Sequence, residues 1–533
     1  MRGAKIKKNI SGRGVTMYLT QGLHRAIQQK PHAIATIHQG RRHSFAELGA
    51  RVAKLASALQ GVGMQAGDRV AMLSLNSDRY LEYYLAVLWG GGVVNPVNIR
   101  WSPTEIAYSL DDCDCRVLIV DDMFAPMVAE LKNRSKVLET VIWAGEGAVC
   151  PEGMLSYEEI LAKAVPVADA MRGYEDIAGI FYTGGTTGFP KGVMLTHSNM
   201  VSNTLAMLSV RPTHSDDIGL HSAPMFHLAD VAFMMALLLR GATHTFVPAF
   251  NPVAVLEIIA RERVTESVLV PTMIQMLVDH PEVKNYDLSS LNWMLYGATV
   301  ISEAVLERAF AAIPDAKFTQ AYGMTELAPI ATILTAEYHT LSGPYAGKLR
   351  SAGRAVMNAD VRIVDGDGRE VPRGTVGEVA VRGANVMKGY WNKPAETAAA
   401  IKNGWMHTGD GGYMDEEGFV FIVDRIKDMI VTGGENVYSA EVENALAKHP
   451  AIAMCAVIGI PDHKWGETVH AAIVFKPNAA ATEEEIKAHC KTLIAGYKCP
   501  RSIEFRTELP ISGAGKLLKY KLREQFALAA ESV

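Results

Sequence analysis

The sequence predicts an α/β fold with a large N-terminal domain, a β-rich subdomain inside it, and a small C-terminal α+β lid domain. Short apolar strands alternate with helical patterns through the first half of the chain, which is typical of largely parallel sheets. The sequence pattern changes near Pro344. From there on, short predicted strands are interrupted by turns that contain Gly, Pro and Asp. A new unit begins after Asp424, and 533 residues are too many for one ordinary hydrophobic core.

The elements of the large domain follow from local patterns. Ser44-Phe-Ala-Glu47 has the form of a capping box, and apolar residues then recur at helical spacing until Gly61 and Gly63 end the run. The same reasoning predicts a helix at 80–89 and strands at 68–75, 116–120, 177–182, 266–270, 293–296 and 317–319.

The subdomain and the lid are expected from shorter patterns. Strands are predicted at 359–364, 377–381, 418–422, 453–458 and 470–475, and helices at 440–448 and 483–493. We therefore expect domains at 17–424, with the β-rich subdomain at 344–423, and at 425–533. Residues 1–16 are predicted to be a disordered arm.

Composition excludes several classes of protein. Hydrophobic residues make up 49% and charged residues 20%, which is the balance of a globular protein, and the net charge of −5 argues against nucleic acid as a partner. Apolar runs stay well short of the ~18 residues that a transmembrane helix needs. The six cysteines lack redox or zinc spacing, so we expect free thiols in a reducing, cytoplasmic setting.

The most informative stretch is Phe181-Tyr-Thr-Gly-Gly-Thr-Thr-Gly-Phe-Pro-Lys-Gly192. It holds four glycines, three threonines and one lysine between an apolar strand and a helix that starts near His197. Glycines allow backbone N–H groups to converge on an anion, while threonine hydroxyls and a lysine add donors and charge. Pro190 and Gly192 flank the lysine, so this is not a Walker A loop.

As a whole, this stretch resembles the AMP-binding signature of the adenylate-forming family, which includes acyl-CoA synthetases, peptide-synthetase adenylation domains and beetle luciferases. Gly184 stands where that signature usually has a serine, so one hydroxyl donor is missing. The resemblance implies that the nucleotide phosphates are bound by Thr183, Gly184, Gly185, Thr186, Thr187, Gly188 and Lys191.

Two further segments resemble the family's nucleotide motifs. Gln320-Ala-Tyr-Gly-Met-Thr-Glu326 implies that Tyr322 packs on the adenine, that Thr325 contacts the α-phosphate, and that Glu326 holds Mg²⁺, with Thr187 as a second candidate ligand. Gly297-Ala-Thr-Val300 resembles the segment along the adenine and the acyl pocket, which implies roles for Gly297, Ala298 and Thr299.

The remaining motifs appear in the family's order. Trp405-Met-His-Thr-Gly-Asp410 and Asp424-Arg-Ile-Lys-Asp428 imply that Asp410 and Arg425 bind the ribose and that Lys427 is the hinge. Pro510-Ile-Ser-Gly-Ala-Gly-Lys516 implies that Lys516 is the catalytic lysine bridging the carboxylate and the α-phosphate. The thiolation loop at the coenzyme A tunnel would contain Gly433, Gly434, Glu435 and Tyr438.

The resemblance implies an ATP-dependent, AMP-forming acyl-CoA synthetase that uses ATP, Mg²⁺ and coenzyme A and has a mobile lid. Its catalytic residues would be Lys516, Glu326, Thr325 and His227, and its acyl pocket would contain His227, Asp230, Val231, Ile330 and Ala331. Many fatty-acid members have glycine where Asp230 stands. Either Asp230 turns away and pairs elsewhere, or it binds a hydroxyl group on the acid.

The apolar pocket favours a medium- or long-chain fatty acid as the substrate. An aryl or hydroxycinnamic (feruloyl-type) acid is the alternative. A ligase that serves a carrier protein, and a non-catalytic nucleotide-binding protein, are the rival functions. The sequence leaves open whether the protein forms a homodimer.

Overall fold

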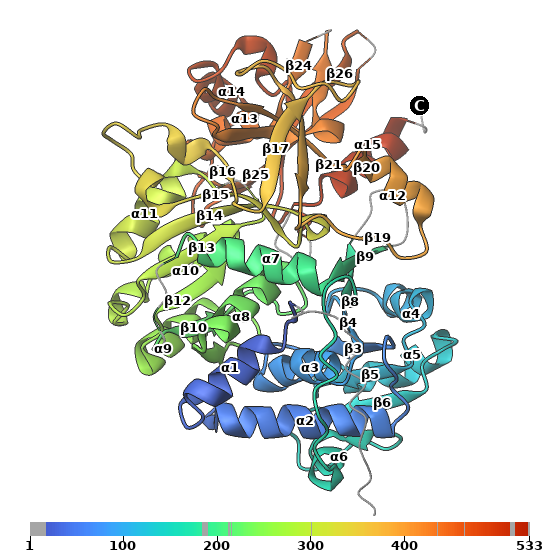
Figure 1. The fold of residues 1–533 in the computed structure, drawn as a ribbon. Helices are drawn as coiled ribbons and strands as arrows, with labels where there is room; N and C mark the ends of the chain where they lie inside the picture. The colour runs from blue at the N-terminus through green and yellow to red at the C-terminus, as the bar shows by residue number, and fades with distance from the viewer. Residues whose placement is uncertain are drawn as a thin grey trace, which may run out of the picture.

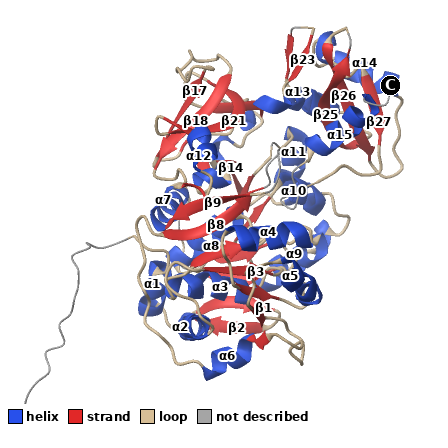
Figure 2. Ribbon diagram, turned by 90° about the vertical axis from the view of Figure 1, so that its right-hand side faces the viewer, coloured by secondary structure: helices blue, strands red, loops and turns tan. Residues whose placement is uncertain are grey.

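The computed structural model describes residues 17–183, 190–211, 214, 216–299, 301–433, 435–462, 464–511 and 517–530. This part of the chain forms two large and two small β-sheets (Figure 1). The large sheets belong to the N-terminal domain, and the last small sheet belongs to a C-terminal domain at one end of the molecule (Figures 1 and 2). The predicted α/β class, with a large N-terminal and a small C-terminal domain, is confirmed.

Both large sheets are parallel inside and antiparallel at an edge, as the alternation of strands and helices predicts. In spatial order the first sheet contains β16 (Arg354–Ala355), β15 (Ile330–Leu334), β14 (Lys317–Gly323), β13 (Trp293–Gly297), β12 (Glu266–Leu269), β10 (Ile218–His221), β11 (Thr243–Phe246), β1 (Ile34–His38) and β2 (Arg41–Ser44). The second contains β19 (Gly389–Tyr390), β9 (Lys191–Thr196), β8 (Ile177–Thr183), β4 (Val93–Pro96), β3 (Arg69–Leu73), β5 (Val117–Val120), β6 (Thr140–Trp143) and β7 (Leu155–Ser156).

Helices fill the space between the large sheets and cover their outer faces (Figure 1). Packed between the sheets or beside them are α1 (Gln21–Gln29), α2 (Phe45–Gly61), α3 (Asp78–Trp89), α6 (Tyr157–Lys163), α7 (His197–Leu208) and α8 (Leu228–Arg240). The outer helices are α4 (Pro103–Asp112) and α5 (Val128–Arg134) on the second sheet, and α9 (Pro252–Glu262), α10 (Pro271–Val278) and α11 (Glu303–Ala312) on the first. Every residue of α3 is buried, because this helix contacts strands of both sheets.

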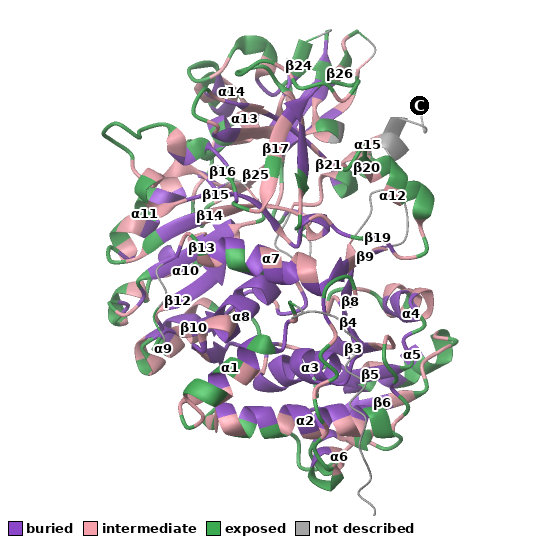
Figure 3. Ribbon diagram, in the orientation of Figure 1, coloured by how far each residue is buried: buried purple, intermediate pink, exposed green. Residues whose placement is uncertain are grey.

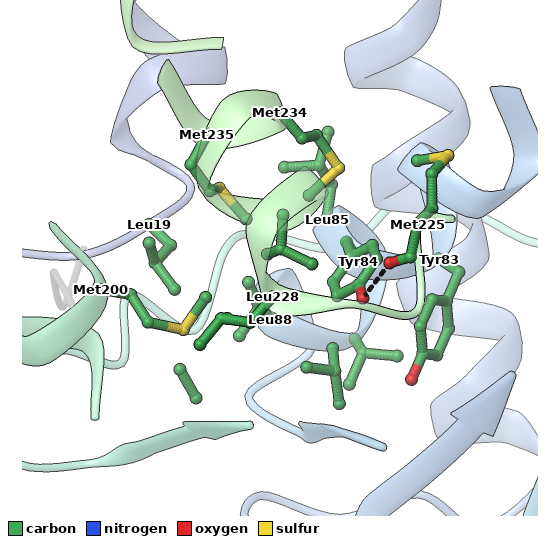
Figure 4. Packing of buried hydrophobic residues seen from close by; sticks show 14 of the residues in the cluster. Leu19, Tyr83, Tyr84, Leu85, Leu88, Met200, Met225, Leu228, Met234 and Met235 are labelled. Carbon is green, nitrogen blue, oxygen red and sulfur yellow. Dashed lines mark hydrogen bonds between the residues drawn. The ribbon is translucent and has the colours of Figure 1, made fainter. Parts of the chain in front are cut away.

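The central core explains why α2, α3 and α8 form where they do. Ser44 and Glu47 make the predicted capping box at the start of α2, whose apolar face then packs against α3. Figure 4 shows Tyr84 of α3 packed among side chains of α8 such as Leu228. The Tyr84 hydroxyl donates to the Met225 carbonyl over 2.8 Å, which satisfies the polar end of a buried ring. The purple core in Figure 3 follows the two large sheets and these helices.

The third sheet is the predicted β-rich subdomain, and the fourth is the core of the C-terminal domain. The third contains β17 (Ala359–Val364), β18 (Gly377–Gly383), β21 (Trp405–Met414), β20 (Ile401–Lys402) and β22 (Val420–Arg425), with α12 (Pro394–Ala400) beside it. The fourth contains β24 (Glu435–Val437), β23 (Ile430–Thr432), β26 (Gly466–Phe475), β25 (Ile452–Asp462) and β27 (Ser502–Phe505), with α13 (Ser439–Ala447), α14 (Glu483–Lys491) and α15 (Lys519–Ala530). A domain boundary between 424 and 425 stays a prediction.

Three local details differ from the predicted elements. A strand, β9, lies between the Gly/Thr-rich stretch and helix α7, so that stretch joins the two strands of the β8–β9 hairpin. Strand β14 continues to Gly323 because β15 pairs with its second half. The strand expected at 418–422 begins only at Val420, because Gly418 has a φ of +83° in a turn closed by Asp415.

Short 3-10 turns complete the description: η1 (Ala125–Met127), η2 (Val283–Asn285), η3 (Thr325–Leu327), η4 (Ala336–Tyr338), η5 (Lys348–Arg350), η6 (Ile426–Asp428) and η7 (Gly496–Lys498). Within the described ranges, a helix long and apolar enough to cross a membrane is absent.

Candidate active site

The predicted nucleotide motifs lie at the carboxyl ends of β8, β13 and β14, the edge at which α/β sheets usually bind ligands. Gly297, at the end of β13, pairs with Ala321 of β14. A Cβ atom on Gly297 would lie 2.2 Å from the Ala321 carbonyl oxygen, so this close approach requires glycine. Ala298 then turns out of the sheet with a φ of +72° and is exposed, next to Thr299.

Tyr322, Asp410 and Arg425 form one hydrogen-bonded group, which we call the Asp410 cluster. The Tyr322 hydroxyl donates to Asp410 Oδ2 over 2.7 Å, and Arg425 Nε lies 2.7 Å from Asp410 Oδ1. Asp410 and Arg425 are directly opposite each other in the antiparallel pair β21–β22. Burial and the Asp410 charge raise the pKa of Tyr322 well above its usual value, so the hydroxyl stays a donor.

A second group, the Tyr390 cluster, joins Lys191 and Glu326 through one tyrosine. The Tyr390 hydroxyl donates to Glu326 Oε1 over 2.8 Å. The Nζ atom of Lys191 lies 4.4 Å from the centre of the Tyr390 ring, a cation–π distance. Burial and the Glu326 charge raise the pKa of Tyr390. Thr325 begins the same 3-10 turn, η3, that holds Glu326, so both predicted residues come from one short segment.

The phosphate-binding residues are placed only in part. Thr183 and Lys191 are cross-strand partners at the end of the β8–β9 hairpin, so both flank the connecting stretch. Gly184, Gly185, Thr186, Thr187 and Gly188 lie outside the described residues, as do Gly434 and Lys516. Their assigned roles stay predictions.

The residues predicted to form the acyl pocket lie on α8 and β15. His227 precedes the first turn of α8 and is half-buried, while Ala229 beside it is exposed. Val231 and Ala331 belong to one apolar cluster and Ile330 to another. All three are at most 4% exposed, so they are closely packed, and their role in acyl binding stays a prediction.

Asp230 forms a buried network with two histidines. Its Oδ1 lies 2.7 Å from His221 Nδ1, and His221 Nε2 lies 3.0 Å from His244 Nδ1. Burial raises the pKa of Asp230, although His221 opposes this, and burial lowers the pKa of His244. The Asp230 side chain is 0% exposed, so the geometry matches the arrangement in which it pairs elsewhere and not the one in which it binds a substrate hydroxyl.

Asp424, next to the expected hinge, forms hydrogen bonds with a residue of the lid. Asp424 Oδ2 accepts hydrogen bonds from the Ser439 amide and hydroxyl at 2.5 and 2.6 Å. Lys519 of α15 donates to the Ser439 hydroxyl and lies 2.8 Å from Glu443. Burial would lower the pKa of Lys519, but the charges of Glu443 and Asp424 outweigh it and raise that pKa. Lys427 lies in η6, and its side chain is outside the description.

The thiolation loop is part of the lid. Gly433 lies in the turn that joins β23 and β24, and its amide donates to the Trp465 carbonyl over 2.8 Å. It has a φ of +61°, which favours glycine, while Glu435 is exposed and Tyr438 precedes α13. These contacts are made inside the C-terminal domain.

Sequence reasoning missed several residues that the structure places at the site. Tyr390 lies in a Gly-Tyr-Trp segment with no spacing relation to Lys191 or Glu326. No sequence pattern marked Ser439, which bonds Asp424, or Lys519, which bonds Ser439. Asp410 and Arg425 were predicted from two separate motifs, and the structure shows them facing each other across the β21–β22 hairpin.

Comparison with known proteins decides the family. The AMP-binding enzyme profile matches residues 23–391, and the profile of the AMP-binding enzyme C-terminal domain matches residues 441–516. The chain belongs to the AMP-binding enzyme family. It is an ATP-dependent, AMP-forming acid–thiol ligase, as its motifs predicted.

Three similar proteins show the range of acids within this family. Feruloyl-CoA synthase from Amycolatopsis is 39% identical over 507 residues, which are 94% of this chain and 98% of that protein. Long-chain-fatty-acid–CoA ligase from Bacillus subtilis is 35% identical, with 93% and 92% covered. The crystal structure of the anthranilate CoA ligase AuaEII with anthranoyl-AMP has a TM-score of 0.89 at 28% identity, with 97% and 99% covered.

The site of the ligase fits Mg²⁺ through the donor set around Glu326. The Tyr390 hydroxyl bonds only Oε1 of Glu326. Among the described residues, Oε2 of Glu326 has no hydrogen-bond partner. A carboxylate oxygen held in this way is the hard ligand that Mg²⁺ prefers. Lys191 Nζ lies over the same Tyr390 ring, and its role toward phosphate stays a prediction.

Proposed function

We propose that this ligase activates a hydrophobic carboxylic acid with ATP and transfers the acyl group to coenzyme A, and that the acid is a compact aromatic one of the hydroxycinnamic class. The observation that carries the adenylation step is the Asp410 cluster. It presents a carboxylate beside an aromatic ring at the carboxyl end of β14, which suits a ribose and an adenine.

In the first step, the substrate carboxylate attacks the α-phosphorus of ATP, and pyrophosphate leaves. Negative charge gathers on the phosphoryl oxygens in the transition state, so fixed donors and cations lower the barrier. We propose that Thr325, Thr183 and Lys191 contribute such donors and charge, and that Lys516 bridges carboxylate and α-phosphate. Magnesium bound at Glu326 would neutralise phosphate charge.

In the second step, the thiol of coenzyme A attacks the carbonyl carbon of the acyl-adenylate, and AMP leaves with the electron pair of the broken bond. We infer that the lid turns about Lys427 between the steps and brings the Gly433–Tyr438 loop to the thiol. The bonds from Ser439 to Asp424 span this pivot, so a rotation there must break or re-form them.

The packing around α8 supports a compact acid. Val231, Ile330 and Ala331 are at most 4% exposed, and Asp230 is held by His221. We infer that a short, flat ring would displace fewer of these packed side chains than a long alkyl chain would. The similarity to a feruloyl-CoA synthase and to an anthranilate CoA ligase supports the same choice.

A medium- or long-chain fatty acid is the second candidate. The 35% identity to a long-chain-fatty-acid–CoA ligase favours it, and the apolar lining of the pocket suits an alkyl chain. A homodimer and a cytoplasmic location stay predictions.

The test is a panel of acids with the purified enzyme, ATP and Mg²⁺, with and without coenzyme A. AMP and pyrophosphate are measured for ferulic, coumaric, benzoic, octanoic and palmitic acids. We expect AMP release to depend on coenzyme A and to be fastest with ferulic or coumaric acid. Preference for octanoic or palmitic acid would select the second candidate. Pyrophosphate release that coenzyme A does not accelerate would instead indicate a ligase that serves another acceptor.

A further inference from the structure

Tyr390 lies between the two charged groups on which nucleotide binding is proposed to depend. Its ring is 5% exposed, and its hydroxyl and its face have different partners. The hydroxyl donates to Glu326 Oε1 over 2.8 Å, and the face receives Lys191 Nζ at 4.4 Å from the centroid. One side chain therefore contacts a carboxylate and a cation that come from separate elements.

The backbone around Tyr390 fixes this position from several sides. Strand β19 pairs with β9, the strand that begins at Lys191, so Tyr390 and Lys191 share a sheet edge (Figure 1). The Tyr390 amide donates to Thr397 Oγ1 over 2.9 Å. Three residues earlier, the Met387 amide donates to the Glu326 carbonyl over 2.9 Å, which ties the same segment to η3.

We propose that Tyr390 is a positioning residue that holds Glu326 and Lys191 in their nucleotide-receiving arrangement before Mg·ATP arrives. This inference rests on the proposed function, because it assumes that Glu326 faces Mg²⁺ and Lys191 faces phosphate. A charge-assisted hydrogen bond to Oε1 fixes the plane of the carboxylate and directs Oε2 outward. The ring holds the Lys191 ammonium over its face.

The energetic role follows from pre-organisation. Lysine and glutamate side chains have several rotatable bonds, and ordering them when the ligand binds would reduce its affinity. Tyr390 orders both in the free enzyme through a ring that packing already immobilises. The hydroxyl acts on the metal-dependent part of binding, and the ring acts on the metal-independent part, so the two contributions separate experimentally.

The experiment measures ATP binding by isothermal titration calorimetry, with Mg²⁺ and with EDTA, in the absence of acid and coenzyme A. Tyr390→Phe removes only the hydroxyl, and Tyr390→Leu removes the ring as well. Tyr286→Phe is the matched control, because Tyr286 packs against the apolar cluster formed by α9, α10 and α11.

We expect Tyr390→Phe to lose roughly tenfold in Mg·ATP affinity, the size typical of a hydrogen bond to a charged group. Its affinity for ATP in EDTA should stay within about twofold of wild type. Tyr390→Leu should lose roughly threefold more under both conditions, because Lys191 loses the ring. In the Glu326→Gln background, Tyr390→Phe should have no further effect on Mg²⁺ dependence.

Three outcomes would overturn the inference. If Tyr390→Phe binds Mg·ATP with wild-type affinity, the Tyr390 hydroxyl does not position Glu326 for binding. Equal losses with Mg²⁺ and with EDTA would mean general damage to the site. A wild-type enzyme whose ATP affinity ignores Mg²⁺ would contradict the proposed function and this inference together, whereas the first two leave the proposed function standing.

Discussion

Replacing Asp410 by asparagine tests the ribose-binding role directly. The asparagine side chain has the same shape but no charge, so the cluster keeps its geometry while its central acceptor weakens. Asp410 is 7% exposed and accepts from Tyr322 and Arg425 at 2.7 Å each. Both partners remain in the variant, and neither is moved by a change of volume.

The size of the effect follows from these contacts. Hydrogen bonds to a charged acceptor contribute ~1.5–3 kcal/mol each, about twice the value of neutral ones. Two ribose hydroxyls that donate to a neutral amide should therefore lose about 3 kcal/mol together, which is roughly 10²-fold in kcat/KM for ATP. The Arg425 side chain is 40% exposed, so water replaces much of its lost ion pair and the fold loses little stability.

The assay compares ATP with 2′,3′-dideoxy-ATP in acid-dependent ATP–pyrophosphate exchange. Wild type should discriminate against the dideoxy nucleotide by roughly the same 10²-fold, and Asp410→Asn should show little discrimination, because the removed contacts are the same. Asp360→Asn is the control, since Asp360 pairs with Arg382 on an exposed surface. An Asp410→Asn enzyme that still discriminates fully between the nucleotides would refute the assignment.

Three further predictions concern buried groups. Burial lowers the pKa of His197 to about 4, below the ordinary value near 6.5, so the unfolded chain takes up the proton first. Stability should be complete above pH 6.5 and fall by about 3 kcal/mol by pH 4, and urea unfolding of His197→Gln should lack this part of the slope. Glu266→Gln should cost about 3–5 kcal/mol in chemical denaturation, because it removes the carboxylate that pairs with buried Arg211 and Arg240. Asp230→Ala should cost about 1–3 kcal/mol by leaving its histidine partner unpaired, yet the order of preferred acids should not change; a changed order would restore the hydroxyl-binding hypothesis.

The sequence predicted the architecture well where local patterns determine it. The capping box at Ser44, the strand at 359–364 and the helix at 483–493 follow from a few neighbouring residues, and the structure contains all three within two residues. Strand β9 was missed because its six residues include Gly192 and follow a turn-rich stretch, so the period-2 pattern is short.

The site was predictable as motifs but not as contacts. Asp410 and Arg425 were found through two separate motifs, and only the structure shows that they face each other across the β21–β22 hairpin. Tyr390 is 64 residues from Glu326, and the two meet because β19 pairs with β9, which in turn packs against η3. The pairing of Asp230 with His221 depends on how α8 packs against β10, which no spacing in the sequence specifies.

The proposed reaction requires that this enzyme make an acyl-adenylate and that coenzyme A consume it. A rapid-quench single turnover, with enzyme in excess over α-labelled ATP, ferulic acid and Mg²⁺ and followed by a coenzyme A chase, tests both steps at once. We expect feruloyl-AMP before the chase, and its conversion to feruloyl-CoA and AMP after it. Formation of ADP and phosphate, or an adenylate that persists through the chase, would rule out this two-step reaction.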